Sequence, residues 1–248
     1  MLVMTCTIPA IGLPLTLMAI YALYSMVRND HTAPIYVINL LLSDLIQLSC
    51  MICEVVLVDD AIAFFMYHYS LIASVGFMVC IAMERYLVIA WPLWYRFRRT
   101  IKSSMVVCVL IWSLPIIYIV PLYYYINKDV IHAILLLLPF PLLLFFLGGT
   151  LKALSASTSV PNDEKLRIVG VLLLVLLIYT LLFMPSIILD LNYFTFNYVY
   201  YGASTMLLKL SPLADLALYI FIRKGTIELL VSPCCCRIYC SDISRPTV

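Results

Sequence analysis

Three ionisable residues, Asp44, Asp215 and Lys209, stand inside long apolar stretches of the sequence. Ionisable groups are costly to bury in a lipid environment, and where they occur they usually serve a function. Ser74 and Ser211 could join the two aspartates in an oxygen-lined site for a small hard cation or a proton. Two carboxyl groups in one such site cannot both ionise easily, so we expect Asp44 and Asp215 to titrate as a pair. A static hydrogen-bonded polar core is the alternative interpretation.

A second set of titratable residues is expected toward the outer half of the molecule. Histidine beside a carboxylate changes charge near physiological pH, so protonation would change its attraction to Glu54 or Asp190 and could make the protein a proton sensor. Lys209 could instead hold a lipid headgroup or a small anion, or it could form an ion pair with Glu54. The candidate residues for this ligand or proton site are Glu54, Tyr67, His68, His132, Asp190 and Lys209.

The 248-residue chain is too apolar to be a soluble protein. Its residues are 65% hydrophobic and 11% charged, whereas soluble domains are about 45–50% apolar and about 25% charged. A helix needs about 20 mainly apolar residues to cross a membrane, and continuous rather than alternating runs exclude a β-barrel. We predict an all-α bundle of seven transmembrane helices over Thr7–Val27, Ala33–Val58, Ala61–Ile89, Ser104–Ile126, Val130–Leu151, Ile168–Leu189 and Val199–Ile222.

The positions of the basic residues predict how the chain is oriented. Nearly all Lys and Arg residues follow the odd-numbered spans or lie in the tail, and such loops face the cytoplasm. We therefore expect a multi-pass protein of the plasma membrane with the N-terminus outside, a transmembrane domain over residues 1–222 and a cytoplasmic tail over residues 223–248. The sequence has no motif of a metalloprotease, phosphate-binding loop or serine hydrolase, which argues against an enzyme with a cofactor. It also has no basic and aromatic stripe for nucleic acid.

A stripe of residues at helical spacing runs along the third predicted helix and ends in Glu84-Arg85-Tyr86. By itself Arg85 could be an arginine that extends to the membrane surface. The stripe consists of Tyr67, Ser70, Ser74, Met78, Ile81 and Arg85.

Together with Trp91-Pro92-Leu93, the triplet Glu84-Arg85-Tyr86 resembles the Glu/Asp-Arg-Tyr motif of rhodopsin-like G-protein-coupled receptors. Further motifs follow in the order of that family, and they cover nearly the whole chain. They are Asn39-Leu-Leu-Leu-Ser-Asp44, Trp112 with Pro115, Tyr179 and Phe183 before Pro185, and Asp215-Leu-Ala-Leu-Tyr219. Within the family the sequence looks most like the branch of proton-sensing, lysolipid and nucleotide receptors.

The resemblance implies how such a receptor would work. An extracellular proton or small ligand would shift the sixth helix about Pro185, in a switch that includes Tyr179 and Phe183, and a heterotrimeric G protein would enter near Arg85. The resemblance also implies a short amphipathic eighth helix in the tail, in contact with membrane lipid and palmitoylated at the cysteines after it. The implied coupling residues are Glu84, Arg85, Tyr86, Pro92 and Tyr219, and the implied lipidation sites are Cys234, Cys235 and Cys236.

Several positions depart from the family pattern. Thr16 stands where the family has Asn, Leu216 where it has Pro, and Asp60 where it has Cys. No cysteine lies between Cys108 and Cys234, so the usual outer disulfide cannot form.

Other interpretations therefore stay open. One is a seven-helix transporter or ion pathway that uses Asp44, Lys209 and Asp215. Another is a retinal-binding protein with a Schiff base on Lys209, which precedes Tyr219 at the spacing found in opsins. The last is a non-signalling, truncated receptor product.

Overall fold

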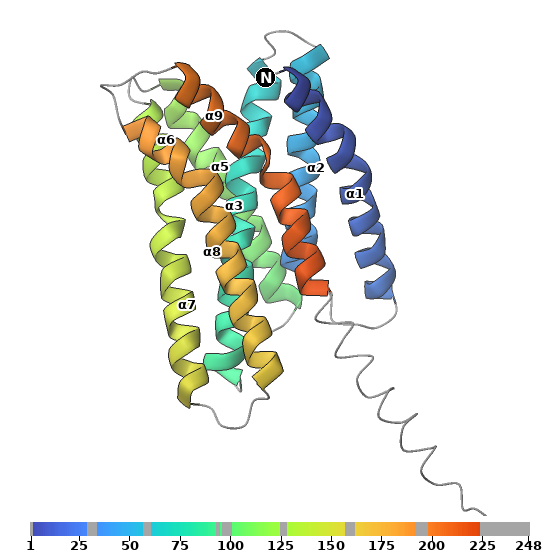
Figure 1. Cartoon of the computed structure of the whole chain (residues 1–248), viewed down its shortest axis with the longest axis vertical. Coiled ribbons are helices and arrows are strands. Elements are labelled where there is room, and N and C mark those ends of the chain that lie inside the picture. Colours follow the sequence, from blue (N-terminus) through green and yellow to red (C-terminus); the bar gives the residue numbers. More distant parts are fainter. Residues whose placement is uncertain are drawn as a thin grey trace, which may run out of the picture.

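The computed structural model describes residues 2–28, 34–56, 61–92, 95, 101–124, 128–156, 162–191 and 198–223. These residues form a bundle of helices (Figure 1). The helices are α1 (Leu2–Arg28), α2 (Ile35–Val56), α3 (Ala61–Ala90), α5 (Ile101–Tyr124), α6 (Lys128–Leu137), α7 (Pro139–Ala156), α8 (Asn162–Leu191), α9 (Tyr198–Lys209) and a helical segment at 211–223 that we call the 211–223 helix.

The described part of the chain contains six helical segments that are long and apolar enough to cross a membrane. A seventh apolar helical stretch, Lys102–Ile116 of α5, is shorter. One of the six, His132–Ser155, joins α6 to α7, and another, Gly202–Arg223, joins α9 to the 211–223 helix. The predicted seven-helix bundle is thereby confirmed.

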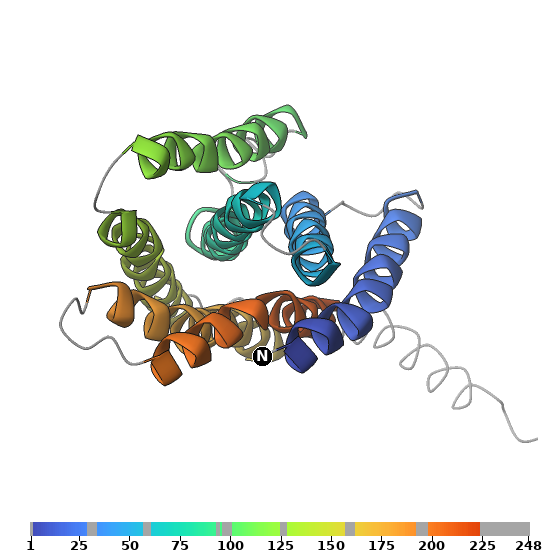
Figure 2. The same cartoon turned by 90° about the horizontal axis from the view of Figure 1, so that it is seen from above.

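Helix α3 is the central element of the bundle (Figure 2). It packs against α2, α5, α7 and α8, while α1 lies at the side against α2 and α9. We call the end of the bundle where α1 begins the upper end and the end where α3 finishes the lower end, as they appear in Figure 1. The α3 stripe from Tyr67 to Ile81 is buried along its whole length, with Ser70, Ser74 and Met78 at 0% exposure. The helical spacing read from the sequence therefore identified the face of α3 that points inward.

Two of the predicted spans are interrupted rather than continuous. The fifth breaks at Leu138, between α6 and α7, because Pro139 has no backbone N–H and can only begin a new helix. The seventh breaks at Leu210, whose N–H is shared between the carbonyls of Met206 and Leu207 at 3.2 and 3.1 Å. Pro212 follows within the first turn of the 211–223 helix, where a proline is tolerated. Pro139 and Pro141 thus lie in the first turn of α7, whereas Pro185 lies inside α8.

A hydrogen-bonded aromatic contact ties α2, α3 and α5 together. The indole Nε1 of Trp112 donates to Oδ1 of Asn39 at 3.0 Å, and the Asn39 amide donates to the carbonyl of Ile35 at 2.9 Å. The hydroxyl of Tyr69 donates to the Trp112 carbonyl at 2.6 Å, and the two rings stack with centroids 6.0 Å apart. Three helices therefore share one polar contact in an otherwise apolar region.

We predict that Trp112→Phe lowers the stability of the bundle. The substitution keeps an aromatic ring but leaves the Asn39 oxygen without its donor, and an unsatisfied buried polar group costs about 1–3 kcal/mol. Thermal unfolding of the detergent-solubilised protein measures the effect. Trp91→Phe is the matched control, because Trp91 is 61% exposed. An equal loss of stability in the two variants would contradict the prediction.

Candidate functional site

The middle of the bundle holds a fully buried polar core. Asp44 of α2, Ser74 of α3 and Asp215 of the 211–223 helix are each at 0% exposure. The Ser74 hydroxyl donates to Oδ2 of Asp215 at 3.2 Å, and the two carboxyl groups lie close enough to interact electrostatically. Ser211 is buried as well. The structure therefore buries the four residues that the sequence suggested for an oxygen-lined site, and it joins three of them directly.

Several oxygen atoms of this core have no hydrogen-bond partner among the described residues. They include both carboxylate oxygens of Asp44, Oδ1 of Asp215 and the hydroxyl of Ser211. Buried polar groups are nearly always paired. A proton or a small hard cation could therefore bind to these oxygen atoms. No cluster of three or more His, Cys, Asp or Glu residues that could hold a metal occurs in the described ranges.

The sequence reasoning missed two members of the polar core. Gln47 and Thr16 are both at 0% exposure, and their side-chain polar atoms lack partners among the described residues. Gln47 follows Asp44 by three residues and so lies on the same face of α2. This spacing could have identified Gln47 from the sequence. Thr16 stood out only as a departure from the family pattern.

The upper half contains an ion pair at the break in the seventh span. Lys209 Nζ donates to both carboxylate oxygens of Glu54, at 2.9 and 2.8 Å. The Lys209 side chain is only 7% exposed, whereas that of Glu54 is 57% exposed. The pairing that the sequence suggested is present, and in the described part of the chain the hydrogen bonds of Lys209 go to Glu54 rather than to the aspartates of the polar core.

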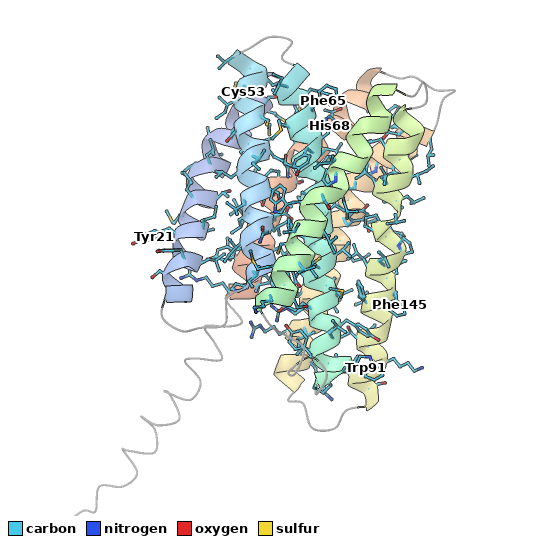
Figure 3. The ribbon with its side chains drawn as sticks, turned by 180° about the vertical axis from the view of Figure 1, so that it is seen from behind. Tyr21, Cys53, Phe65, His68, Trp91 and Phe145 are labelled. Carbon is cyan, nitrogen blue, oxygen red and sulfur yellow. The ribbon has the colours of Figure 1, made fainter. Side chains whose placement is uncertain are left out.

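A histidine pair lies at the upper end beside a carboxylate. His132 Nδ1 of α6 and Asp190 Oδ2 of α8 are 2.9 Å apart, with side chains 12% and 15% exposed. The His68 ring of α3 lies edge to face with that of His132, with centroids 5.8 Å apart. His68 Nδ1 is 2.9 Å from the Phe64 carbonyl, which assigns the ring proton to Nδ1. Figure 3 shows His68 near the upper end of the bundle. Three helices thus bring their titratable groups together here.

The predicted coupling residues lie at the lower end. Glu84, Arg85 and Tyr86 occupy the last turns of α3 and are partly buried, while Pro92 is exposed just past the helix end. Glu84 Oε1 accepts a hydrogen bond from the Tyr95 hydroxyl at 2.6 Å. Arg85 Nε is buried without a hydrogen-bond partner in the described part of the chain. Nothing in the sequence singled out Tyr95, because its position after the end of α3 does not show which side chain it reaches.

Tyr86 is held against α7 by a close approach of the two helices. Its ring contacts Phe145 and Phe146, with centroids 5.8 and 5.7 Å away. A Cβ added at Gly149 would lie 2.6 Å from Cε2 of Tyr86, a distance that no real contact permits. A larger residue at position 149 would therefore push the Tyr86 ring away from α7. Figure 3 shows Phe145 and Trp91 in the lower half of the bundle.

The aromatic pair before Pro185 links α8 to the break between α6 and α7. Tyr179 and Phe183 are both fully buried and stack with centroids 5.0 Å apart. The Tyr179 hydroxyl donates to the carbonyl of Leu136, one of the carbonyls that a helix end leaves without an intrahelical partner. The predicted switch residues are therefore packed directly on a helix end.

Tyr219 lies buried near the foot of the seventh span. Arg223 Nη1 donates to its hydroxyl at 3.4 Å, and Tyr219 itself is 6% exposed. Arg167 of α8 donates to the carbonyl of Ile222 at 3.0 Å, a favourable place for a cation because a helix C-terminus is negatively polarised. The predicted lipidation sites Cys234, Cys235 and Cys236, with the predicted amphipathic segment, lie outside the described residues.

Comparison with known proteins agrees with this arrangement. Residues 15–133 match the family model of the seven-transmembrane receptors of the rhodopsin family. With the seven-helix bundle, this match supports a rhodopsin-like (class A) G-protein-coupled receptor. It is a multi-pass membrane protein and a signalling receptor, not an enzyme.

The relatives are distant, and two of the three described here match nearly the whole chain. G-protein coupled receptor 68 of Mus musculus is 24% identical over 96% of this chain and 78% of its own length. The Homo sapiens protein of the same name is 23% identical over the same shares. Mas-related G-protein coupled receptor member X1 of Homo sapiens is 30% identical, but only over 46% of this chain and 38% of its own.

We predict that Gly149→Ala reduces signalling at equal surface expression. The added methyl group must displace the Tyr86 ring from α7, and overpacking of this kind costs about 1–3 kcal/mol. Gly148→Ala is the matched control, because a Cβ there meets nothing within 4 Å. G-protein activation per surface receptor is the measurement, and an equal response of the two variants would show that the position of Tyr86 does not matter.

Proposed function

We propose that this receptor senses extracellular protons through His68, His132 and Asp190 and activates a heterotrimeric G protein through Glu84-Arg85-Tyr86. The observation that carries the proposal is the contact at 2.9 Å between His132 and Asp190, which bridges α6 and α8 beside the ring of His68. Histidine is the side chain whose ordinary charge change falls between about pH 5 and 8.

The charges around the histidines give the expected response its physical basis. Protonation of His132 turns its contact with Asp190 into a charge-assisted hydrogen bond, which strengthens the link between α6 and α8. Protonation of His68 then places a second positive charge 5.8 Å from the first, on α3. Glu54 of α2 and Asp190 of α8 are the carboxylates whose charges reach His68. Falling pH would therefore favour an arrangement in which α3 separates from α6 while α6 and α8 stay together.

Helix α8 is the element suited to carry such a change to the lower end. It bears Asp190 near its upper end, Tyr179 and Phe183 in its middle and Arg167 near its lower end. Pro185 removes one backbone hydrogen bond between Asp190 and the aromatic pair, and helices bend at such positions. A stimulus that prefers one of two bundle arrangements shifts the population toward it.

We also propose how the receptor is oriented in the membrane and how its chain divides into a transmembrane domain and a tail. The upper end would face the outside and the lower end the cytoplasm, as the distribution of basic residues supports. We also propose that the receptor lies in the plasma membrane, that residues 1–222 form its transmembrane domain and that 223–248 form a tail palmitoylated at Cys234, Cys235 and Cys236. The basic loops at the lower end would attract the G protein and anionic lipid.

We predict that G-protein activation in cells rises as the pH is lowered from about 8 to about 6, a window that brackets histidine titration. His132→Phe, His68→Phe and Asp190→Asn should each shift the midpoint or flatten the response, because each removes a charge from the cluster. His31→Phe is the matched control for loss of a histidine elsewhere. Arg85→Ala should abolish the signal at every pH.

Surface staining of each variant shows whether a lost response comes from lost sensing or from lost expression at the surface. A midpoint that none of the cluster variants moves, and that Asp215→Asn also leaves in place, would rule out these proton sites. A flat response at normal surface expression would rule out protons as the stimulus. Absence of the protein from the surface would favour a non-signalling product.

A further inference from the structure

We propose that Lys209 and Tyr67 form a binding site for an anionic headgroup, a carboxylate or phosphate, and that Glu54 occupies this site in the unliganded receptor. The site lies between α2, α3 and the lower end of α9, next to the histidine cluster, since the rings of Tyr67 and His68 have centroids 5.5 Å apart. Its existence does not require that protons are the stimulus or that the receptor couples to a G protein, so the test below can fail or succeed independently of the proposed function.

The cation of this site is buried and fixed in place. Lys209 is the last residue of α9 and is 6% exposed. A lysine at a helix C-terminus is favoured by the helix dipole, and the turn at Leu210 ends the helix directly after it. A buried ammonium group strongly needs an anion beside it. The site therefore attracts a negative charge, whichever molecule carries it.

A second donor of this site is not used. Tyr67 is 9% exposed, and its hydroxyl is buried without a hydrogen-bond partner in the part of the chain that the structure describes. It lies within electrostatic reach of Glu54 and Cys50. A buried hydroxyl without a partner costs free energy, so an incoming group with an oxygen acceptor would gain a hydrogen bond that Glu54 does not make.

Glu54 has the features of a competitor that can be displaced. Its two oxygens both accept from Lys209, at 2.9 and 2.8 Å, which is the geometry that a free carboxylate or a phosphate would reproduce. Its side chain is 57% exposed, so it can leave Lys209 without losing a buried position. Lys209 cannot leave in the same way. Because the Lys209 side chain is buried and the Glu54 side chain is exposed, Glu54 is the partner that another anion can replace.

The position of Glu54 also suits an amphiphile. Glu54 lies near the upper end of the apolar span Ile35–Val56. A lipid could therefore place its headgroup at Lys209 and keep its acyl chain in the membrane. A small soluble acid would share the headgroup chemistry without the chain, so the experiment must separate these two sources.

The test measures binding to the full chain, purified and placed in nanodiscs of phosphatidylcholine. The probes are radiolabelled oleate and butyrate, with unlabelled methyl oleate, which has no charge, as the competitor control. We expect Glu54→Gln to bind oleate about tenfold more tightly than the wild type, because it removes the internal competitor. Lys209→Met should lose binding, Lys209→Arg should keep it, and Tyr67→Phe should weaken it several-fold.

The gain of binding in Glu54→Gln is the arm that misfolding cannot imitate. Binding of oleate alone would identify an amphiphile, and binding of both acids would identify the headgroup as sufficient. Binding of butyrate alone would identify a soluble acid. The proposal is overturned if neither acid binds to Glu54→Gln, if methyl oleate competes fully, or if Lys209→Met binds as well as the wild type.

Discussion

Every polar group that this chain buries within a membrane must find its partner inside the bundle, because the lipid offers none. The structure concentrates such groups on the inner face of α3 and on the helices around it. Ser74 contacts Asp215, and Tyr69 contacts the Trp112 carbonyl. The central position of α3 follows from this requirement, since it is the element from which all these partners can be reached.

The fold and the inward faces of the helices could be predicted from the sequence. The number of spans followed from run length and hydropathy, and the stripe from Tyr67 to Arg85 followed from helical periodicity. The breaks at Leu138 and Leu210 were not predicted as breaks, although the prolines that cause them were visible. A proline in an apolar run allows either a kink or a new helix, and only packing against neighbours decides between them.

The candidate site, like the fold, could be predicted from the sequence only in part. Residue type alone indicated that Asp44, Asp215, His132 and Lys209 matter, because charges in a membrane are expensive. Which partner each one contacts depends on how helices distant in the sequence meet. Asp190 faces His132 because α8 packs on α6, and Tyr95 reaches Glu84 from beyond the end of α3. These pairings are tertiary facts that no local pattern encodes.

The lack of cysteine between Cys108 and Cys234 has a mechanical consequence for the upper end. In receptors with a disulfide at this end, the bridge holds two segments at a fixed distance, and a reducing agent can break that bridge. In this chain the described contacts that hold α2 to α9 and α6 to α8 are ionic or hydrogen-bonded, and the five described cysteines are free thiols. The described polar contacts at this end therefore involve titratable groups and contain no bond that a reducing agent could break.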